Sequence, residues 1–246
     1  NAAGTAIQWQ QSYGGTTTNQ GYTCIASRNG GYYLSGFSNS GISADKSEAS
    51  RGAFDIWLVR TDVSGTMTWD KTLGGNDWEA ALIATEALDG GYLTAGYSRS
   101  GISGEKSEAN RGGNGDDYWL VKTDASGSLR WDKTLGGSGT DQPYALQQTA
   151  DSGYIIGGFS NSPISGDKTE AGRGGYDFWL LKLDTARNID WQRTLGGTGD
   201  DQLFSIFQTP DGGYITGGAS ASGISGERTE ASNGGTDYWM LRLDPS

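Results

Sequence analysis

The sequence predicts an all-β fold built from four repeated units, each a small antiparallel sheet. One motif, Trp-x-x-(Ser/Thr)-(Tyr/Leu)-Gly-Gly, recurs at spacings of 60, 62 and 60 residues, beginning at Trp9, Trp69, Trp131 and Trp191. An Asp-x-Trp series has nearly the same period, beginning at Asp55, Asp117, Asp177 and Asp237. No segment keeps a helical period over three turns, and a fixed long period is typical of repeat architectures.

The third unit shows the expected elements in chain order. Short runs rich in β-branched and aromatic residues, separated by turn residues, indicate strands. The expected strands are 144–149, 154–159, 177–184 and 189–195, with a long polar loop over 160–176. The turn before the second strand is Asp151-Ser-Gly, and its counterparts Asn29-Gly-Gly, Asp89-Gly-Gly and Asp211-Gly-Gly also suit tight hairpins.

Tandem four-stranded meanders of this kind are the blades of a β-propeller. The chain begins with a lone segment of fourth-strand sequence, Ile7–Tyr13, and its last unit ends after a third strand, Asp237–Asp244. We therefore expect the N-terminal strand to complete the last blade and remove a free edge. This predicts one domain over 1–246, a four-bladed propeller with blades at approximately 17–75, 76–137, 138–197, and 198–244 plus 5–15. An open array within a longer protein is the alternative.

The repeats resemble the bacterial SBBP-type β-propeller repeats of secreted and surface proteins, notably of Bacteroidetes. The matching residues are Leu195-Gly-Gly-Thr-Gly-Asp-Asp, Asp211-Gly-Gly-Tyr-Ile-Thr-Gly-Gly and Gly234-Gly-Thr-Asp-Tyr-Trp-Met-Leu-Arg-Leu-Asp. The resemblance covers nearly the whole chain and implies a tandem-repeat propeller that serves as a binding or spacer module. The long Ser-Gly-Ile-Ser-type insert and the small number of repeats depart from the common pattern.

Composition and charge limit the classes of partner that this chain can bind. The formal net charge of −11 argues against nucleic acid, because a basic surface is missing. The chain has no run of 18 apolar residues, so the sequence does not predict insertion into a membrane. The chain starts at Asn1, which we interpret as a processed N-terminus, and we expect an extracellular or cell-surface location. Cys24 aligns with Ala84, Leu146 and Ile206 and is expected to be buried.

Function is expected on the face that carries the four long loops, over 38–54, 98–116, 160–176 and 220–236. Each loop contains one phrase of the form Ile-Ser-x-(Asp/Glu)-(Lys/Arg)-(Ser/Thr)-Glu. Pairing of its cation with the neighbouring acids is the simplest interpretation, and a calcium site built from those acids is an alternative. Otherwise no cofactor is expected. The candidate ligand-binding residues are Asp45, Glu48, Arg51, Trp78, Glu105, Glu108, Arg111, Asp167, Glu170, Arg173, Glu227 and Glu230.

The residue types on this face favour a carbohydrate ligand, since sugars bind through hydrogen bonds and stacking on aromatic rings. The repeated tryptophans are expected in the core, whereas Trp78 has no aromatic counterpart and could be an exposed anchor or fill a crevice. With no histidine in the chain, nucleophilic systems that need one are excluded. A carboxylate pair, with Glu108 and Asp117 as examples, leaves glycoside hydrolysis as a less favoured reading.

The sequence therefore predicts a secreted or cell-surface, non-enzymatic binding module with a glycan or a surface protein as its partner. A protein-interaction or structural scaffold within a larger adhesin, filament or other assembly is the alternative. No catalytic residue is assigned.

Overall fold

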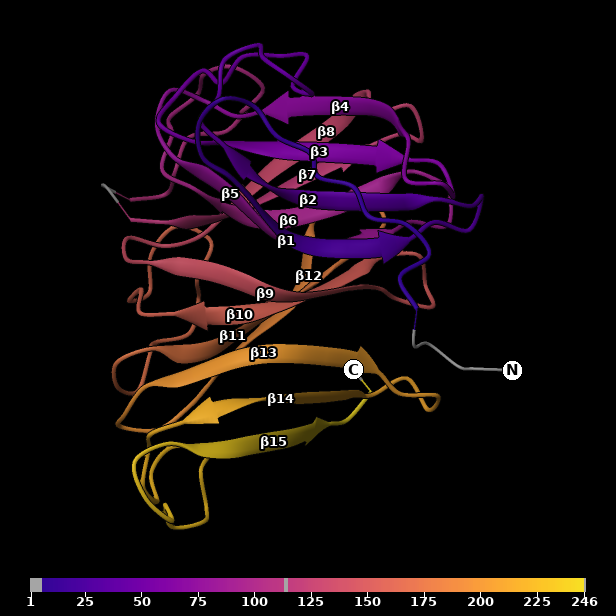
Figure 1. The fold of residues 1–246 in the computed structure, drawn as a ribbon. Coiled ribbons are helices and arrows are strands. Elements are labelled where there is room, and N and C mark those ends of the chain that lie inside the picture. The colour runs from indigo at the N-terminus through magenta and orange to yellow at the C-terminus, as the bar shows by residue number, and fades with distance from the viewer. Residues whose placement is uncertain (1–5, 113–114, 246) are drawn as a thin grey trace.

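A computed structural model describes residues 6–112 and 115–245, which form fifteen strands in four antiparallel sheets (Figure 1). The first sheet contains β1 (Asn19–Ala26), β2 (Tyr32–Ser38), β3 (Asp55–Thr61) and β4 (Met67–Leu73). The second contains β5 (Glu79–Glu86), β6 (Tyr92–Ser98), β7 (Asp117–Thr123) and β8 (Leu129–Leu135). The third contains β9 (Asp141–Gln148), β10 (Tyr154–Ser160), β11 (Asp177–Leu183) and β12 (Ile189–Leu195). The fourth contains β13 (Asp201–Gln208), β14 (Tyr214–Ser220) and β15 (Asp237–Leu243).

Each sheet is a meander in which consecutive strands pair, so the predicted all-β repeat is confirmed. The tight hairpins depend on residues that tolerate positive φ, such as Gly90 at 79° and Ser152 at 67°. The described residues contain no helix long and apolar enough to cross a membrane.

The sheets stack in chain order, with the first strands at the centre of the contacts. β1 and β2 pack on β5, β5 and β6 pack on β9, and β9 and β10 pack on β13. We call β1, β5, β9 and β13 the inner strands. Between neighbouring sheets, an apolar row on one sheet meets a tryptophan row on the next. Ile56 and Leu58, for example, pack with Trp119 in one buried cluster. Of the repeated tryptophans predicted for the core, Trp57, Trp119 and Trp179 are buried. Trp69, Trp131, Trp191 and Trp239 are half-buried, and the prediction is wrong for Trp9, which is 41% exposed.

The predicted closure is not present in this structure. The last sheet has three strands, and Ile7–Tyr13 forms no strand with β15. Figure 1 shows the first and last sheets at opposite ends of the stack, and they do not pack against each other. Ile7–Tyr13 lies on the first sheet instead, where the Trp9 ring is 5.5 Å from that of Tyr32. Residue 5 of the predicted closing strand lies outside the described residues.

Cys24 is a second correction, because it is exposed. Its counterparts Ala84 and Ile206 are 5% and 3% exposed, since each faces the preceding sheet. No described sheet precedes the first one, so the same position lies open to solvent. Burial at this position is decided by the neighbouring sheet and not by the residue type.

Candidate binding surface

The four long loops lie between β2 and β3, β6 and β7, β10 and β11, and β14 and β15. We call them the clasp loops, because they connect neighbouring sheets. Their central lysines Lys46, Lys106 and Lys168 are each 1% exposed. The Lys106 ammonium donates a hydrogen bond to the Thr134 hydroxyl, and Lys168 donates to the Ser160 hydroxyl over 3.0 Å. Burial lowers the pKa of Lys106 to about 8, and the charges of Asp117 and Asp132 oppose this decrease. These lysines hold the loop from within through hydroxyl groups, and none of the three pairs with an acid of its own phrase among the described residues. The predicted pairing is therefore wrong for them, because Glu48 and Glu108 pair with Lys71 and Arg111 instead.

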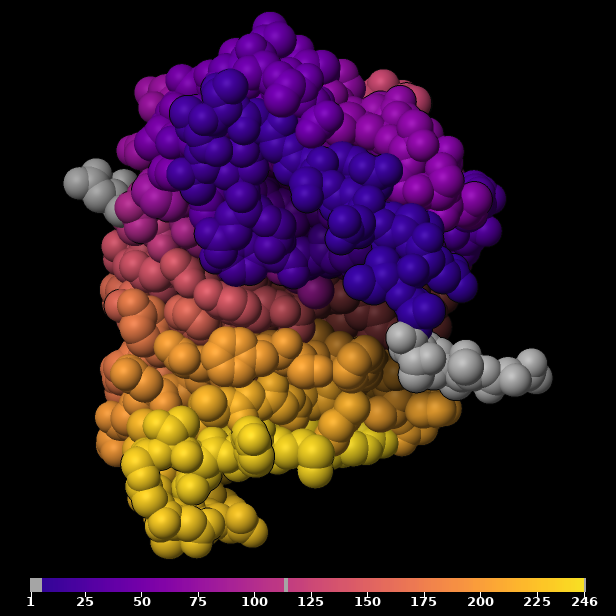
Figure 2. Space-filling model, viewed as in Figure 1, coloured from indigo at the N-terminus to yellow at the C-terminus, as the bar shows by residue number. Residues whose placement is uncertain are grey.

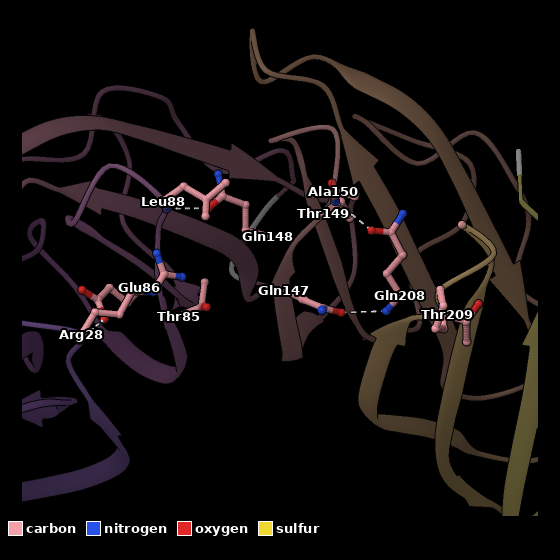
Figure 3. Close-up of a pocket in the computed structure, with 12 residues that line it drawn as sticks. Arg28, Thr85, Glu86, Leu88, Gln147, Gln148, Thr149, Ala150, Gln208 and Thr209 are labelled. Carbon is pink, nitrogen blue, oxygen red and sulfur yellow. Dashed lines mark hydrogen bonds between the residues drawn. The ribbon is translucent and has the colours of Figure 1, made fainter.

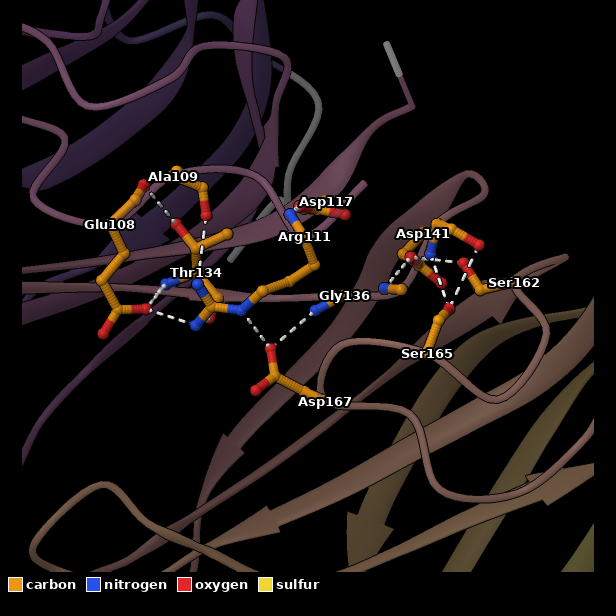
Figure 4. Close-up of polar contacts among 12 residues, drawn as sticks. Glu108, Ala109, Arg111, Asp117, Thr134, Gly136, Asp141, Ser162, Ser165 and Asp167 are labelled. Carbon is orange, nitrogen blue, oxygen red and sulfur yellow. Dashed lines mark hydrogen bonds and ion pairs between the residues drawn. The ribbon is translucent and has the colours of Figure 1, made fainter. Parts of the chain in front are cut away.

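The first acid of each phrase reaches the preceding sheet. Gly136 N–H donates to the Asp167 carboxylate over 3.2 Å, and Arg111 Nε pairs with the same carboxylate over 2.7 Å (Figure 4). The same arrangement joins the other sheets, through Glu105 to Gly74 and Arg51, and through Glu227 to Gly196 and Arg173. Asp45 accepts a hydrogen bond from Gly14 N–H in the N-terminal segment.

The second acid of each phrase binds the fourth strand of its own sheet. Glu48, Glu108 and Glu170 each accept a backbone N–H from Thr72, Thr134 and Thr194, respectively. Glu48 also pairs with Lys71, and Glu108 with Arg111. In the last sheet, which has three described strands, the Glu230 carboxylate is exposed and accepts no hydrogen bond from a described residue.

The predicted loop residues are therefore distributed over separate contacts between and within sheets. The described residues include no group of three acidic, histidine or cysteine side chains placed to hold a metal ion. The carboxylates that were candidates for calcium instead meet arginines, lysines and backbone amides. Most of the predicted ligand-binding residues thus hold the scaffold together.

Trp78 is the exception among the predicted residues. It is half-buried at the junction of the first two sheets, where its ring lies 4.3 Å from that of Phe54. The Arg99 guanidinium lies over the same ring at 5.7 Å from the centroid. Trp78 therefore fills a crevice and still presents part of its ring beside a charged group.

A polar bridge that sequence reasoning missed extends from Arg99 to the third sheet. Arg99 Nε pairs with Asp116 over 2.6 Å, and the Gln142 amide donates to the other carboxylate oxygen over 2.6 Å. The Asp116 side chain is 4% exposed, whereas that of Arg99 is 43% exposed. The repeats contain a signal for this site, because the position is acidic in only one unit. The other units have Phe54, Tyr176 and Thr236 at the position of Asp116.

Aromatic residues continue this bridge along the inner strands. Each inner strand has one bulge, and the unpaired residues there are Tyr22, Leu82, Tyr144 and Phe204. Such bulges redirect a side chain out of the regular alternation. The Tyr144 hydroxyl donates to Gln142 over 3.3 Å, and its ring lies 5.4 Å from that of Phe204. We call the connected set Trp78, Arg99, Asp116, Gln142, Tyr144 and Phe204 the inner strip.

A cavity of about 580 Å³ lies at the tight-turn end of the inner strands, opposite the long loops (Figure 3). Its walls contain one hydrogen-bonded contact for each pair of neighbouring sheets. Glu86 accepts Arg28 N–H, Gln148 accepts Leu88 N–H, and Gln208 accepts Ala150 N–H, each over 2.8 Å. The Glu86, Gln148 and Gln208 side chains that line this cavity are thus engaged in joining the sheets.

Buried carboxyl pairs lie beneath the long loops. Asp117 begins β7 and Asp141 begins β9, and both are fully buried. Asp117 accepts Arg111 N–H, and Asp141 accepts Gly137 N–H and the Ser162 hydroxyl. Burial raises the pKa of Asp117 to about 7, with a further contribution from the charge of Asp141. Glu108 and Asp117, the acids considered for glycoside hydrolysis, therefore lie in structural contacts.

No protein-family model matches the chain. A segment of 141 residues, 56% of this chain, is 25% identical to the "Regulatory protein FlaEY" of Caulobacter vibrioides. The match spans 15% of that protein. The matched segment therefore covers a small part of this relative.

Proposed function

We propose that this chain is a non-enzymatic carbohydrate-binding module of a secreted or cell-surface protein. The inner strip is the observation that carries the proposal. Pairwise contacts join a tryptophan, a tyrosine and a phenylalanine to a guanidinium, a buried carboxylate and an amide. Aromatic stacking surfaces and directional hydrogen-bonding groups are the two features that sugar-binding sites combine.

The geometry of the strip suits an extended polar ligand. Contacts connect Trp78 on the second sheet to Phe204 on the fourth, so successive sugar rings have successive partners. Phe204 is 46% exposed, and Arg99 keeps exposed donors beyond its bond to Asp116. Asp116 is held on both oxygens, which fixes Arg99 in place before a ligand binds.

The contacts of the two acids that were considered for catalysis support a role without catalysis. Glycoside hydrolysis needs two carboxyl groups that flank a substrate. Asp117 is fully buried, and Glu108 is paired with Arg111 and with a backbone amide. Activity against a panel of glycosides would contradict this part of the proposal.

The test is binding of neutral and acidic polysaccharides, measured by affinity electrophoresis and then by calorimetry. Phe204→Ala and Trp78→Ala are each expected to weaken binding about tenfold, which corresponds to about 1.4 kcal/mol. Arg130→Ala is the matched control, because Arg130 is an exposed arginine paired with Asp124 away from the strip. Equal binding by all three variants, or no binding by the parent chain, would contradict the proposal.

A protein-interaction or structural scaffold is the second candidate, in line with the SBBP-type resemblance. The observation that favours it is the exposed apolar face of the last sheet, where Tyr238 is 101% and Met240 is 73% exposed. Exposed apolar groups of this size often mark protein contacts. The name of the Caulobacter relative, a regulatory protein, is compatible with action through a protein partner.

A further inference from the structure

The last sheet presents a face that is buried in the other three. Tyr238 corresponds to Ile56, Tyr118 and Phe178, and Met240 corresponds to Leu58, Leu120 and Leu180. All six counterparts are 0% exposed, because the following sheet covers them. Figure 2 shows the last sheet, in yellow, at one end of the stack. This face has the chemistry of a sheet-to-sheet contact, and no described sheet covers it.

The first sheet presents the matching socket. In the interior of the stack, Tyr118 donates to Trp179 O over 3.2 Å and its hydroxyl lies against Gly158. The corresponding residues of the first sheet are Gly36 and Trp57, and they line a cavity of about 230 Å³. Cys24, exposed here, aligns with positions that the neighbouring sheet buries. A side chain in the position of Tyr238 therefore has a preformed site on the first sheet.

The N-terminal segment is placed as the fourth strand of a sheet that would precede the first. Asp45 N–H donates to Gly14 O over 3.1 Å, as Glu105 N–H donates to Gly74 O over 3.1 Å. Thr16 N–H donates to Ser43 Oγ over 3.1 Å, as Asn76 N–H donates to Ser103 Oγ over 3.0 Å. The first sheet thus holds Gly14 and Thr16, which directly follow Ile7–Tyr13, by the contacts that join the other neighbouring sheets.

The last sheet has acceptor and donor groups ready for such a strand. Glu230 corresponds to Glu48, Glu108 and Glu170, which bind the fourth strand, and Ser12 corresponds to the Thr72 donor. The indole N–H of Trp179 donates to Gln192, and Gln10 is the counterpart of Gln192 for Trp239. The edge of β15 therefore matches Ile7–Tyr13 in sequence and in register.

A third feature points to this pair of sheets in particular. At the tight-turn end, Arg28, Leu88 and Ala150 each donate a backbone N–H to a side chain on the next sheet. The next residue in this series is Pro210, which has no N–H, and the first sheet has Ala26 at the acceptor position. Donor and acceptor are missing together, so contact of the last sheet with the first leaves neither group unpaired.

We propose that the last sheet binds a second copy of this chain, with β15 pairing to Ile7–Tyr13 of that copy and Tyr238 entering its Gly36–Trp57 socket. The two surfaces lie at opposite ends of one stack, and within one chain they do not meet. A head-to-tail contact of this kind closes into a ring where its rotation permits. Two copies give eight sheets, which is within the usual range for propellers.

The first test is the mass of the chain in solution, measured by light scattering, together with the reactivity of Cys24, the single cysteine. We expect a dimer in which Cys24 reacts at least tenfold more slowly with a thiol reagent than in the unfolded chain. A monomer at all concentrations would overturn the proposal. In that monomer, a reactive Cys24 would indicate an open stack, and a protected Cys24 would indicate that the chain's own last sheet covers it.

The second test identifies which chain supplies the strand. By the register of β3 with β4, Met240 is expected opposite Gln11. One population carries Gln11→Cys and Cys24→Ser, and a differently tagged population carries Met240→Cys and Cys24→Ser. Mixing under oxidising conditions is expected to give a disulfide between the two tags. A chain with both cysteines that forms only an intrachain disulfide would overturn the proposal and support closure by its own N-terminus.

The third test disrupts the contact. Both side chains of a Tyr238→Ser, Met240→Ser variant are exposed in the single chain, so the sheets are expected to fold and the dimer to dissociate. The control is Val63→Ser, since Val63 is 66% exposed on a hairpin of the first sheet. A dimer that persists in the double variant would overturn the proposal.

Discussion

Buried carboxyl groups at the sheet junctions are expected to make stability depend on pH. Asp117 has its pKa raised to about 7 by burial, from an ordinary value of 3.8. The folded chain therefore binds more protons than the unfolded chain between about pH 4 and 7. The contribution of the protonated group to the free energy of unfolding is full below about pH 4. It decreases between about pH 4 and 7, by at most about 1.4 kcal/mol per pH unit, and is constant above about pH 7.

Asp117→Asn should flatten that slope, because an amide keeps an acceptor for Arg111 N–H and has no proton to lose. The measurement is urea unfolding at a series of pH values. Asp77→Asn, at an exposed carboxyl group, is the control and should keep the parent slope. Burial also raises the pKa of Asp141, so a residual slope in the same direction is expected. A slope unchanged by Asp117→Asn would contradict the assignment.

Glycine is required where a carboxylate occupies the space of a side chain. A Cβ on Gly196 would lie 1.9 Å from Asp177 Oδ1 and 2.9 Å from Asp201 Oδ2, two fully buried groups. Gly196→Ala is therefore expected to lower the free energy of unfolding by more than about 2 kcal/mol. Gly223→Ala is the matched control, since nothing lies within 4 Å of its added Cβ, and it should change stability by less than about 0.5 kcal/mol. Chemical denaturation measures both.

At the scale of elements, the clasp loops make a prediction about the junctions. Asp167→Ala removes the acceptor of Gly136 N–H and the partner of Arg111, which is partly exposed to solvent. We expect a loss of about 1–2 kcal/mol in the free energy of unfolding. Asp45→Ala removes the equivalent bond to Gly14, where no arginine pair has been described, and should cost about 0.5 kcal/mol. Equal effects in denaturant titrations would contradict this role for the ion pair.

Strands and hairpins followed from local sequence, because their signals are local. Alternating apolar residues and Gly-containing turns fixed the meanders of 144–149, 154–159, 177–184 and 189–195, which the structure has as β9–β12. The loop phrase was harder to interpret, since its acids and cations suit both ligand binding and local pairing. Only the partners across the junction, such as Gly136 for Asp167, assign it to the scaffold.

The inner strip shows what repeat patterns conceal. Asp116 has no acidic counterpart in the other units, but its partners Arg99 and Gln142 are 17 and 26 residues away in sequence, so no local pattern connects the three. The bulges that redirect Tyr144 and Phe204 have no sequence signal of their own, because they depend on how two strands are paired. Trp78 was identified only because its position is aromatic in one unit.

For the whole molecule, stability is expected to depend on protein concentration. If the last sheet of one copy covers the first sheet of another, mass action raises the midpoint of thermal unfolding as the concentration increases. Calorimetry over a hundredfold range of concentration is expected to show this increase for the parent chain. The Tyr238→Ser, Met240→Ser variant should have a midpoint that does not change. A constant midpoint for the parent would argue against assembly.

The sequence by itself determined the number of units, their strands and the turns between them, because each depends on residues close together in the chain. It also predicts a fourth strand at Ile7–Tyr13, where the structure has no strand. Tertiary structure alone decided where that segment lies, which acids connect neighbouring sheets, and which side chains form the inner strip. Those outcomes depend on contacts between sheets about 60 residues apart in the chain, and the repeats present several equivalent partners for each of them.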